Sequence, residues 1–290
     1  MATWSPVDLH LHTSASDGSL TPAELVALAL ERGLRVIAIT DHDSTEGVDA
    51  ALAAARGSGL EVIPGVEINT DVPTGEVHVL GYFLDHHDPV LRDRLACQRL
   101  GRLDRGLAMV QRLRELGLDV SWQRVQEIAG AAGGGAVGRP HVAQALVERG
   151  HVATVKEAFD RYIGNQGPAY VPRAKLTPEH AVRMICDAGG LAVLAHPAER
   201  PSWPAATPYI PSLVEAGLVG LECYYAGYTP PEVASLLSLA RSYNLVPTGG
   251  SDFHGPLVTP DAPLGGTPVP LSVVDELRAR KDRLAPRPAE

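Results

Sequence analysis

The sequence predicts an α/β fold, a βα barrel of about seven strands that carries a helical insertion. Short apolar runs alternate with amphipathic segments through residues 1–88 and again through residues 174–290. Between these two parts, residues 89–173 show helical patterns and no strand pattern. The chain has 290 residues, of which 45% are hydrophobic, so it can bury the core of one large domain with an insertion.

The first part of the predicted barrel begins with a strand at Val7–Leu9. A helix then starts at Thr21, Pro22 and Glu24, which match an N-cap, a first-turn proline and a capping-box acid. The run RVIAIT is the second strand, and a helix follows from about Glu46. The runs EVIPGVEI and EVHVLGYF are two successive strands, and the missing helix between them breaks the alternation.

The insertion and the second part of the barrel follow. Residues 89–117 predict one long helix, and SWQRVQEIA, GRPHVAQALVERG and TVKEAFDRYIG predict three shorter helices. A helix over Pro178–Ala188 then precedes the strand LAVLAHP, and later helices precede GLVGLECY and LVPTGGSDFHG. We therefore predict a first barrel part at 1–88, an insertion at 89–173 and a second barrel part at 174–290.

Composition disfavours several classes of protein. No apolar run is long enough to span a bilayer, and the first residues lack the basic and apolar pattern of a signal peptide. The cysteines, Cys97, Cys186 and Cys223, are widely spaced and fit no disulfide framework or zinc knuckle. We expect a cytoplasmic protein with no membrane contact and no obligatory protein partner.

Charge divides along the same boundaries. Residues 89–173 contain 13 Lys/Arg and 8 Asp/Glu, whereas the remainder contains 12 and 26, within a chain of net charge −9. Acidic groups that converge on one site need cations, and a basic insertion suits an anionic ligand. The alternative is a chance bias of the surface.

Histidines and carboxylates gather at the predicted strand ends. His10 and His12 lie two positions apart on a strand, so both side chains face the same way. In a βα barrel the strand ends form the site. The residues at or inside these ends, with Asp17 in the loop after the first strand, are His10, His12, Asp41, His42, Glu67, His78, His196, Glu222, Asp252 and His254.

Imidazole and carboxylate ligands in this number predict more than one divalent metal ion. They are the ligands of zinc, manganese or iron, and none of them is a cysteine. Glu67 could bridge two ions, and Asp252 could close a site from the opposite side. Asp41 could instead cap a helix or orient His42. We leave Glu222 unassigned.

The adjacent His86 and His87 are expected to point in different directions from a surface loop, outside the metal site.

Six motifs in order resemble those of the PHP (polymerase and histidinol phosphatase) family. They are DLHLHTSASDG, ITDHDSTEG, GVEI, HVLGY, LAHP and GSDFHG. The resemblance implies a distorted seven-stranded βα barrel with two or three divalent ions at the strand ends, manganese being favoured over iron and zinc. The implied ligand sets are His10, His12, Glu67 and Asp252 for one ion, Glu67, His78 and His196 for a second, and Asp17, His42 and His254 for a third.

The third set departs from the family pattern. Several family members have His where this chain has Asp17, which leaves the occupancy of the third site open. Without a third ion, Asp17, His42 or His254 could serve the proton transfer.

The insertion resembles that of the subgroup which acts on nucleotides, including 3′,5′-bisphosphate nucleotide phosphatases and 5′→3′ exoribonucleases. Arginine pairs with phosphate through two parallel hydrogen bonds, so basic residues of the insertion are candidate phosphate ligands. They could equally form a solvated helix face. These substrate-binding candidates are Arg99, Arg102, Arg105, Arg139, His141 and Arg173.

The predicted function is a metal-dependent phosphoesterase in which a metal-activated water attacks a phosphate ester of a nucleotide. The predicted substrates are 3′,5′-bisphosphate nucleotides or the 5′ ends of short oligonucleotides. One alternative is a histidinol-phosphate type of small-molecule phosphatase, and another is a non-catalytic module on a degenerate barrel. An amidohydrolase-type C–N hydrolase usually needs a carboxylated lysine on a strand, and the only lysines, Lys156, Lys175 and Lys281, lie on no predicted strand.

Overall fold

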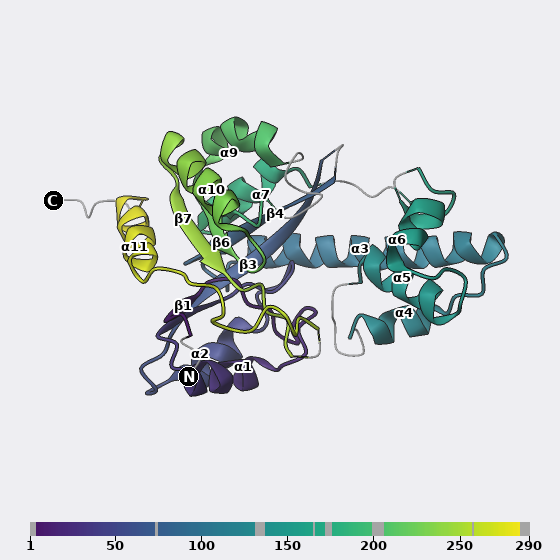
Figure 1. Cartoon of the computed structure of the whole chain (residues 1–290), viewed down its shortest axis with the longest axis horizontal. Coiled ribbons are helices and arrows are strands. Elements are labelled where there is room, and N and C mark those ends of the chain that lie inside the picture. The colour runs from purple at the N-terminus through teal and green to yellow at the C-terminus, as the bar shows by residue number, and fades with distance from the viewer. Residues whose placement is uncertain are drawn as a thin grey trace. The chain divides into compact units, whose positions relative to one another are not determined.

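Seven strands form one sheet whose spatial order follows the sequence, β1 to β7. They are β1 (Val7–Asp8), β2 (Val36–Ile39), β3 (Glu61–Val72), β4 (Gly75–Tyr82), β5 (Leu191–Leu194), β6 (Leu218–Tyr225) and β7 (Val246–Gly250). The computed structural model, drawn in Figure 1, describes residues 4–72, 75–130, 137–164, 166–171, 176–198, 206–256 and 258–284.

The chain divides into two compact units. The barrel unit comprises Met1–Asp93 and Lys175–Glu290, and the insertion unit comprises Arg94–Ala174. Helices of the barrel unit are α1 (Pro22–Glu31), α2 (Val48–Ala55), α7 (Pro178–Asp187), α9 (Ile210–Ala216), α10 (Pro230–Ser242) and α11 (Ser272–Leu284), with the short η3 (Thr207–Tyr209). The long helix α3 (Pro89–Glu115) starts in the barrel unit and continues into the insertion, followed by α4 (Trp122–Ile128), α5 (Arg139–Glu148), α6 (Val155–Ala158) and η2 (Phe159–Ile163).

One strand departs from the parallel direction of the others. Strand β4 runs antiparallel to both β3 and β5, whereas the other neighbouring strands are parallel. A parallel connection needs a crossover of about a dozen residues, but only two residues separate β3 from β4. The break in alternation seen in the sequence is therefore a hairpin.

The sheet curls until its first and last strands meet. Beyond the short β1, the backbone N–H of Leu9 donates to Gly249 and that of His12 donates to Phe253. Gly250 packs against His10 so closely that a Cβ at this position would overlap the Cβ of His10. This seam nearly closes the barrel and confirms the predicted fold class.

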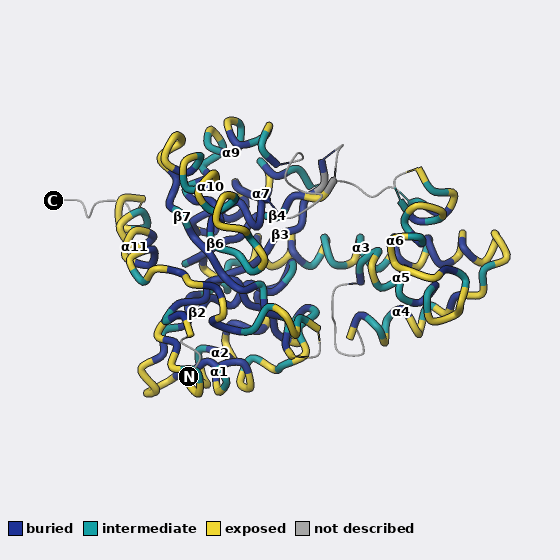
Figure 2. The backbone as a smooth tube through the Cα atoms, viewed as in Figure 1, coloured by how far each residue is buried: buried dark blue, intermediate teal, exposed yellow. Residues whose placement is uncertain are grey.

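The barrel strands are buried on both faces (Figure 2). All four residues of β2 are buried, and they alternate between two apolar clusters. Val36 and Ala38 join one cluster, while Ile37 and Ile39 join the cluster that contains Leu25 of α1. Near-continuous apolar strands are typical of parallel sheets covered by helices.

Helix starts follow the predicted capping chemistry. The hydroxyl of Thr21 accepts from the N–H of Glu24 at 3.3 Å, and the Glu24 carboxylate accepts from the N–H of Thr21 at 2.8 Å, which confirms the capping box.

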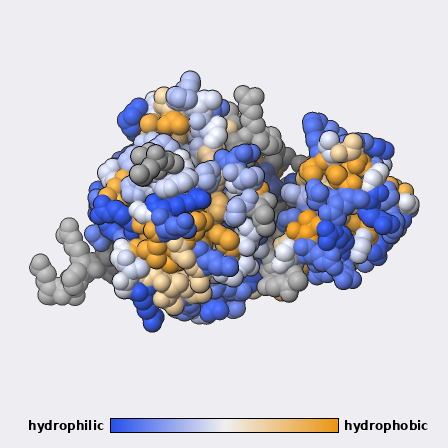
Figure 3. Space-filling view, turned by 60° about the horizontal axis from the view of Figure 1, so that its bottom comes forward, coloured by the Kyte–Doolittle hydropathy of each residue, from blue (hydrophilic) through white to orange (hydrophobic). Residues whose placement is uncertain are grey.

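The insertion unit has its own apolar core, in which residues of α3 such as Met109 and Leu113 pack with Val125 and Leu146. No helix among the described residues is long and apolar enough to cross a membrane. The face in Figure 3 mixes hydrophilic and hydrophobic residues over both units.

Candidate metal centre

Side chains from most of the strands converge at one site in the barrel unit. All nine residues predicted as metal ligands lie there, with ligand atoms in mutual contact across three overlapping groups. The first group is His10, His12, Glu67 and Asp252, the second is Glu67, His78 and His196 with His42 beside them, and the third is His12, Asp17, His42 and His254.

The first group centres on two carboxylate oxygens. Glu67 Oε2 lies 3.2 Å from the Nε2 atoms of both His10 and His12. Asp252 Oδ1 lies 3.2 Å from His10 Nε2 and 3.1 Å from His12 Nε2. Four ligand atoms from the segment after β1, from β3 and from the segment after β7 therefore face one another.

These atoms lack ordinary hydrogen-bond partners. In the part of the chain that the structure describes, His10 Nε2, His12 Nε2, Glu67 Oε2 and Asp252 Oδ1 are buried and accept or donate no hydrogen bond. A buried polar atom without a partner costs about 1–3 kcal/mol, so four of them pointing at one spot would be strongly destabilising. A divalent cation satisfies all four at once, and the donor set fits one.

Glu67 connects the first group to the second. Its Oε1 atom lies 2.9 Å from His78 Nδ1 and 3.0 Å from His196 Nε2, while its Oε2 atom faces His10 and His12. Glu67 Oε2 also lies 3.0 Å from His42 Nδ1, so this carboxylate lies between the groups with one oxygen on His78 and His196 and the other on His10, His12 and His42.

Strand direction explains how His78 reaches this site. His78 lies in the first half of β4 and pairs with Asn69 of β3. Because β4 is antiparallel, its beginning lies at the barrel end where the parallel strands finish.

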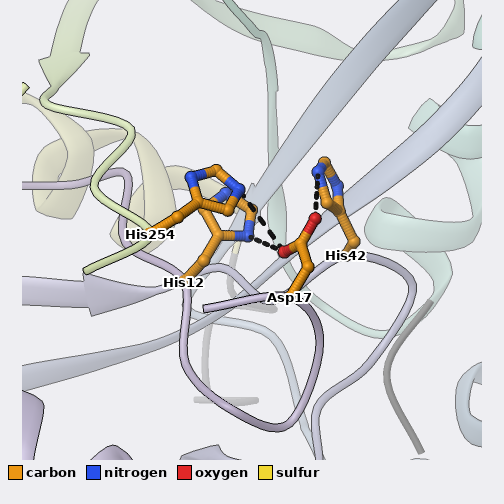
Figure 4. Close-up of side chains that lie close together, drawn as sticks. All are labelled: His12, Asp17, His42 and His254. Carbon is orange, nitrogen blue, oxygen red and sulfur yellow. Dashed lines mark ion pairs between the residues drawn. The ribbon is translucent and has the colours of Figure 1, made fainter. Parts of the chain in front are cut away.

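The third group is more open and looser. Asp17 Oδ1 lies 3.6 Å from His12 Nδ1 and 3.4 Å from His254 Nε2, and Asp17 Oδ2 lies 3.7 Å from His42 Nε2 (Figure 4). The rings of His12 and His254 stack with centroids 3.9 Å apart. The distances leave room for an ion between Asp17 and three imidazoles.

Comparison with known proteins identifies the family. The family model described as PHP domain matches residues 8–164. The chain belongs to the PHP family.

Characterised relatives cover most of the chain. The 5′-3′ exoribonuclease Rnm of Salmonella typhimurium is 39% identical over 255 residues, which are 86% of this chain and 85% of that protein. The 3′,5′-nucleoside bisphosphate phosphatase of Chromobacterium violaceum is 32% identical over 260 residues, 86% of this chain and 87% of that one. These are PHP relatives, so the chain is an enzyme, a metal-dependent phosphoesterase.

Solved structures agree with the fold. A protein of Bifidobacterium adolescentis assigned as a metal-dependent phosphoesterase superposes with a TM-score of 0.80 and 32% identity, covering 94% of this chain and 96% of that one. A structure from Chromobacterium violaceum, named an amidohydrolase and holding sulfate but no metal, has a TM-score of 0.80 and 31% identity, covering 95% and 97%.

Charge coupling at the PHP site is strong. Burial alone would lower the pKa of His12, but the adjacent carboxylates of Asp252 and Glu67 outweigh it and raise that pKa to about 10. Burial would also lower the pKa of His10. The carboxylates of Asp252, Glu222 and Glu67 outweigh burial and raise this pKa well above its usual value. Without metal, the site is therefore a network of imidazolium and carboxylate groups, and an incoming cation must displace protons.

At the third group the shifts differ. Burial would raise the pKa of Asp17, but His42 and His254 hold it well below its usual range, so Asp17 is ionised. Burial lowers the pKa of His42 despite the nearby carboxylates of Glu67 and Asp17, so this imidazole is neutral at pH 7. Neutral imidazole and ionised carboxylate are the forms that bind metals.

Glu222 has a role that the sequence analysis missed. Its fully buried carboxylate lies 3.0 Å from His10 Nδ1 and accepts a 2.7 Å hydrogen bond from the N–H of His196. It thereby turns His10 Nε2 toward the first group and fixes the backbone at His196, where φ is +21°. The position of Glu222 at a strand end was the available signal.

Two further positioning contacts were also missed. The Tyr225 hydroxyl donates to Asp252 Oδ2 at 2.8 Å, which leaves Oδ1 to face the histidines. The Asn69 amide lies 3.0 Å from His42 Nδ1 and is itself 3.3 Å from Asp43 Oδ2.

The expectations for Asp41 were wrong. Its carboxylate accepts hydrogen bonds from the N–H and hydroxyl of Thr13 and from the hydroxyl of Ser16. The following helix α2 has Gly47 at its N-cap and no side-chain cap, and His42 contacts Asn69 instead. The hydrogen-bonding capacity of Asp41 is therefore used by the loop that carries Asp17, and Asp41 holds this loop in place.

The expectation that His86 and His87 point apart was also wrong. Their ring centroids are 4.1 Å apart, and both Nε2 atoms approach Asp49 Oδ1, at 3.0 and 3.4 Å. The loop turns after Asp85, whose carboxylate accepts from the N–H of His87, and this brings the two rings to one side.

Basic residues of the insertion contribute to its own packing. Arg105 donates to the carbonyl of Val171 at 2.9 Å, and the Arg139 guanidinium lies 5.3 Å from the Phe159 ring centroid. His141 accepts from the N–H of Gly138 at the start of α5.

Arg99 and Arg102 lie half-buried on α3, and Arg173 lies outside the described residues.

Proposed function

We propose that this chain hydrolyses phosphate esters of nucleotides, either 3′,5′-bisphosphate nucleotides or the 5′ ends of short oligonucleotides. The observation that carries the proposal is the convergence of the buried atoms His10 Nε2, His12 Nε2 and Asp252 Oδ1 on Glu67 Oε2, none of which has a hydrogen-bond partner among the described residues. The activities named for the Salmonella and Chromobacterium relatives support this substrate class.

We propose that two ions are held by the first two groups and that a third can bind Asp17, His42 and His254. The nitrogen and oxygen donors suit zinc, manganese or iron, and we propose manganese because the resemblance to the PHP family favours it. Bound divalent ions supply an activated water and neutralise the oxygens of the phosphoryl group. Glu67 holds both ligand groups at a fixed separation, and Tyr225 and Glu222 keep Asp252 and His10 aimed inward.

The residues of the third group are proposed to handle protons. The neutral imidazole of His42 can accept a proton at pH 7, whereas the pKa of Asp17 is held well below its usual range, so Asp17 stays ionised and orients the neighbouring imidazoles. His254 stacks on His12 beside them and is held by its Nδ1 contact to the Asp252 carbonyl at 2.8 Å. If a third ion binds, these three side chains become its ligands instead.

The proposed phosphate ligands lie in the insertion. Arg99, Arg102, Arg105, Arg139, His141 and Arg173 are proposed to bind the phosphate that does not react. Arg102→Ala should then raise KM for a bisphosphate nucleotide more than for a nucleoside monophosphate. We also propose a cytoplasmic location, which the three free cysteines support.

A phosphate-release screen tests the function. The full chain is treated with EDTA, reloaded with Mn²⁺, Fe²⁺ or Zn²⁺, and given adenosine 3′,5′-bisphosphate, short 5′-phosphorylated RNA, histidinol phosphate and an aryl phosphate. We expect turnover of the bisphosphate or the RNA to exceed that of the other two and to be highest with Mn²⁺. Preference for histidinol phosphate would support the small-molecule alternative, and turnover that survives EDTA would contradict the proposal.

An amidohydrolase function has less support. That class usually uses a carboxylated lysine on a barrel strand, and none of the three lysines lies on any of the seven strands that the structure describes.

A further inference from the structure

Asp8, the last residue of β1, carries a buried carboxylate that is not among the ligand atoms of the three groups. It accepts hydrogen bonds from Ser251 and Gly265, which lie 243 and 257 positions further along the chain. Ser251 directly follows β7, so these contacts cross the seam that closes the barrel. A buried carboxylate costs free energy unless it is hydrogen bonded, so Asp8 and its donors hold one another in place.

Both oxygens of Asp8 act as acceptors. Oδ1 accepts from the N–H of Ser251 at 2.9 Å and from the N–H of His10 at 3.4 Å. Oδ2 accepts from the Ser251 hydroxyl at 2.6 Å and from the N–H of Gly265 at 2.8 Å. A carboxylate can satisfy donors on both sides, whereas an amide offers one accepting oxygen and one donating nitrogen. The site therefore specifies Asp over Asn.

The residues that Asp8 holds enclose two predicted metal ligands in the sequence. Asp252 directly follows Ser251, and His254 also lies between Ser251 and Gly265. The chain is thus bonded to one side chain of β1 both just before these ligands and after them. One buried group therefore links the two strands that lead into the metal centre from opposite sides of the seam.

The backbone at Asp252 depends on such support. Its φ is +56°, a left-handed conformation that is uncommon for residues other than glycine and persists where neighbouring contacts fix it. The N–H of Asp252 donates to the carbonyl of His10 at 3.0 Å, and Ser251 before it is held by two bonds to Asp8. Two successive residues are thus fixed to the chain of β1, and Asp252 Oδ1 meets the Nε2 atoms of His10 and His12.

We propose that Asp8 is a positioning residue of the metal centre, which keeps Asp252 in the first ligand group by holding Ser251 and Gly265. This inference rests on the proposed function, in which the first group holds a divalent ion, and it specifies what sets the affinity for that ion. Asp8 acts through the backbone of its donors and contributes no ligand atom of its own.

The test measures Mn²⁺ binding to the full chain after EDTA treatment, by calorimetry at pH 8. Asp8→Asn keeps the size of the side chain but loses one acceptor, so we expect one Mn²⁺ ion to bind about tenfold more weakly. Ser251→Ala removes the hydroxyl donor and keeps the N–H donor, so its affinity should fall in the same direction by a smaller factor. This milder variant decides the question if Asp8→Asn does not fold.

Ser5→Ala is the control for a purely structural role. The Ser5 hydroxyl donates to the carbonyl of Val7 at 2.8 Å and accepts from the N–H of Val269 at 3.2 Å, so it also joins β1 to the last part of the chain. Thermal melting followed by circular dichroism should show a loss of stability in both Ser5→Ala and Asp8→Asn, whereas only Asp8→Asn should lose Mn²⁺ affinity.

The outcomes separate this inference from the proposed function. Wild-type Mn²⁺ affinity in folded Asp8→Asn or Ser251→Ala, or an equal loss of affinity in Ser5→Ala, would overturn the positioning role. A wild-type protein whose Mn²⁺ affinity depends on Asp8 but which hydrolyses no nucleotide would support the positioning role and overturn the proposed function alone.

Discussion

Two clusters of histidine and carboxylate in this chain have similar composition but very different surroundings. One is His10, His12, Glu67 and Asp252 at the barrel end, and the other is Asp49, His86 and His87 between α2 and the loop after β4. In both, the ligand atoms lie within 4.8 Å of one another. Proximity and residue type alone therefore do not distinguish them.

Burial and hydrogen bonding do distinguish the two clusters. The side chains of His10, His12 and Glu67 are at most 1% exposed, and the atoms that face one another have no other partner in the described part of the chain. The Asp49 side chain is 66% exposed, and its carboxylate already hydrogen bonds to His86. The second cluster is exposed to solvent, whereas the ligand atoms of the first cluster are buried and face only one another, as the ligands of a shared cation do.

The largest difference in phosphoesterase turnover should appear when one carboxylate in each cluster is replaced by its amide. Glu67→Gln should reduce phosphoesterase turnover by about a thousandfold or more, because both proposed ions lose their shared ligand. Asp49→Asn should leave kcat unchanged. Steady-state kinetics together with circular dichroism separate loss of chemistry from loss of fold, and a Glu67→Gln enzyme within tenfold of wild type would contradict the assignment.

Acidity should release the metal from the buried cluster. The pKa of His12 is raised to about 10 in the metal-free protein, so below that pH its imidazole carries a proton that metal must displace. Affinity should then fall about tenfold per pH unit for each displaced proton, or about a hundredfold between pH 8 and pH 6. Calorimetry in buffers of different ionisation enthalpy should show proton release on Mn²⁺ binding. Uptake of protons, or none, would be inconsistent with this charge network.

The raised pKa of His12 also makes the stability of the metal-free protein depend on pH. Because the folded pKa of His12 lies above the unfolded value of about 6.5, its contribution is fully present below pH 6.5 and is lost as pH rises through about 10. His12 therefore stabilises the EDTA-treated protein more at pH 6.5 than at pH 10.

Glu222→Gln should weaken the metal centre without removing a ligand. The amide can still contact His10 but no longer favours the orientation and charge that the carboxylate supports, so metal affinity should drop about 10- to 100-fold. Glu61→Gln, on an exposed carboxylate of β3, serves as the matched exchange and should retain wild-type affinity. Equal metal affinities for the two variants would mean that Glu222 only packs.

The smallest effect is expected at the exposed cluster. Asp49→Asn removes a solvated contact, so the melting temperature should move by less than about 2 °C. Metal content after dialysis should equal that of the wild type. A stoichiometry that drops by one ion in this variant would show that exposure does not prevent the second cluster from binding metal.

The metal-ligand candidates could be predicted from the sequence because most of them stand at the end of an apolar run with a strand pattern. His10, Asp252 and His196 follow apolar runs, and a βα barrel brings such ends together. The direction of β4 was not predicted, although the missing helix before it was the available signal, because so short a connection cannot join two parallel strands. The family resemblance implied that His78 is a metal ligand, and the antiparallel direction of β4 explains how its side chain reaches the site.

The supporting residues were harder to predict because they act over long sequence distances. Glu222 meets His10 across 212 positions, and no spacing rule links them. Asp41 was expected to act on its neighbours, yet its partners, Thr13 and Ser16, lie on the preceding loop. Local patterns therefore identify the ligands, and only tertiary packing shows what orients them.

The seam between β1 and β7 has a consequence for how the enzyme is made. His10 lies on one side of that seam and Asp252 on the other, so two ligands of one proposed ion come from opposite ends of the barrel sequence. During translation the first ligands leave the ribosome long before the last strand is synthesised. A nascent or truncated chain that lacks β7 cannot complete this centre, so metal loading belongs to the final stage of folding.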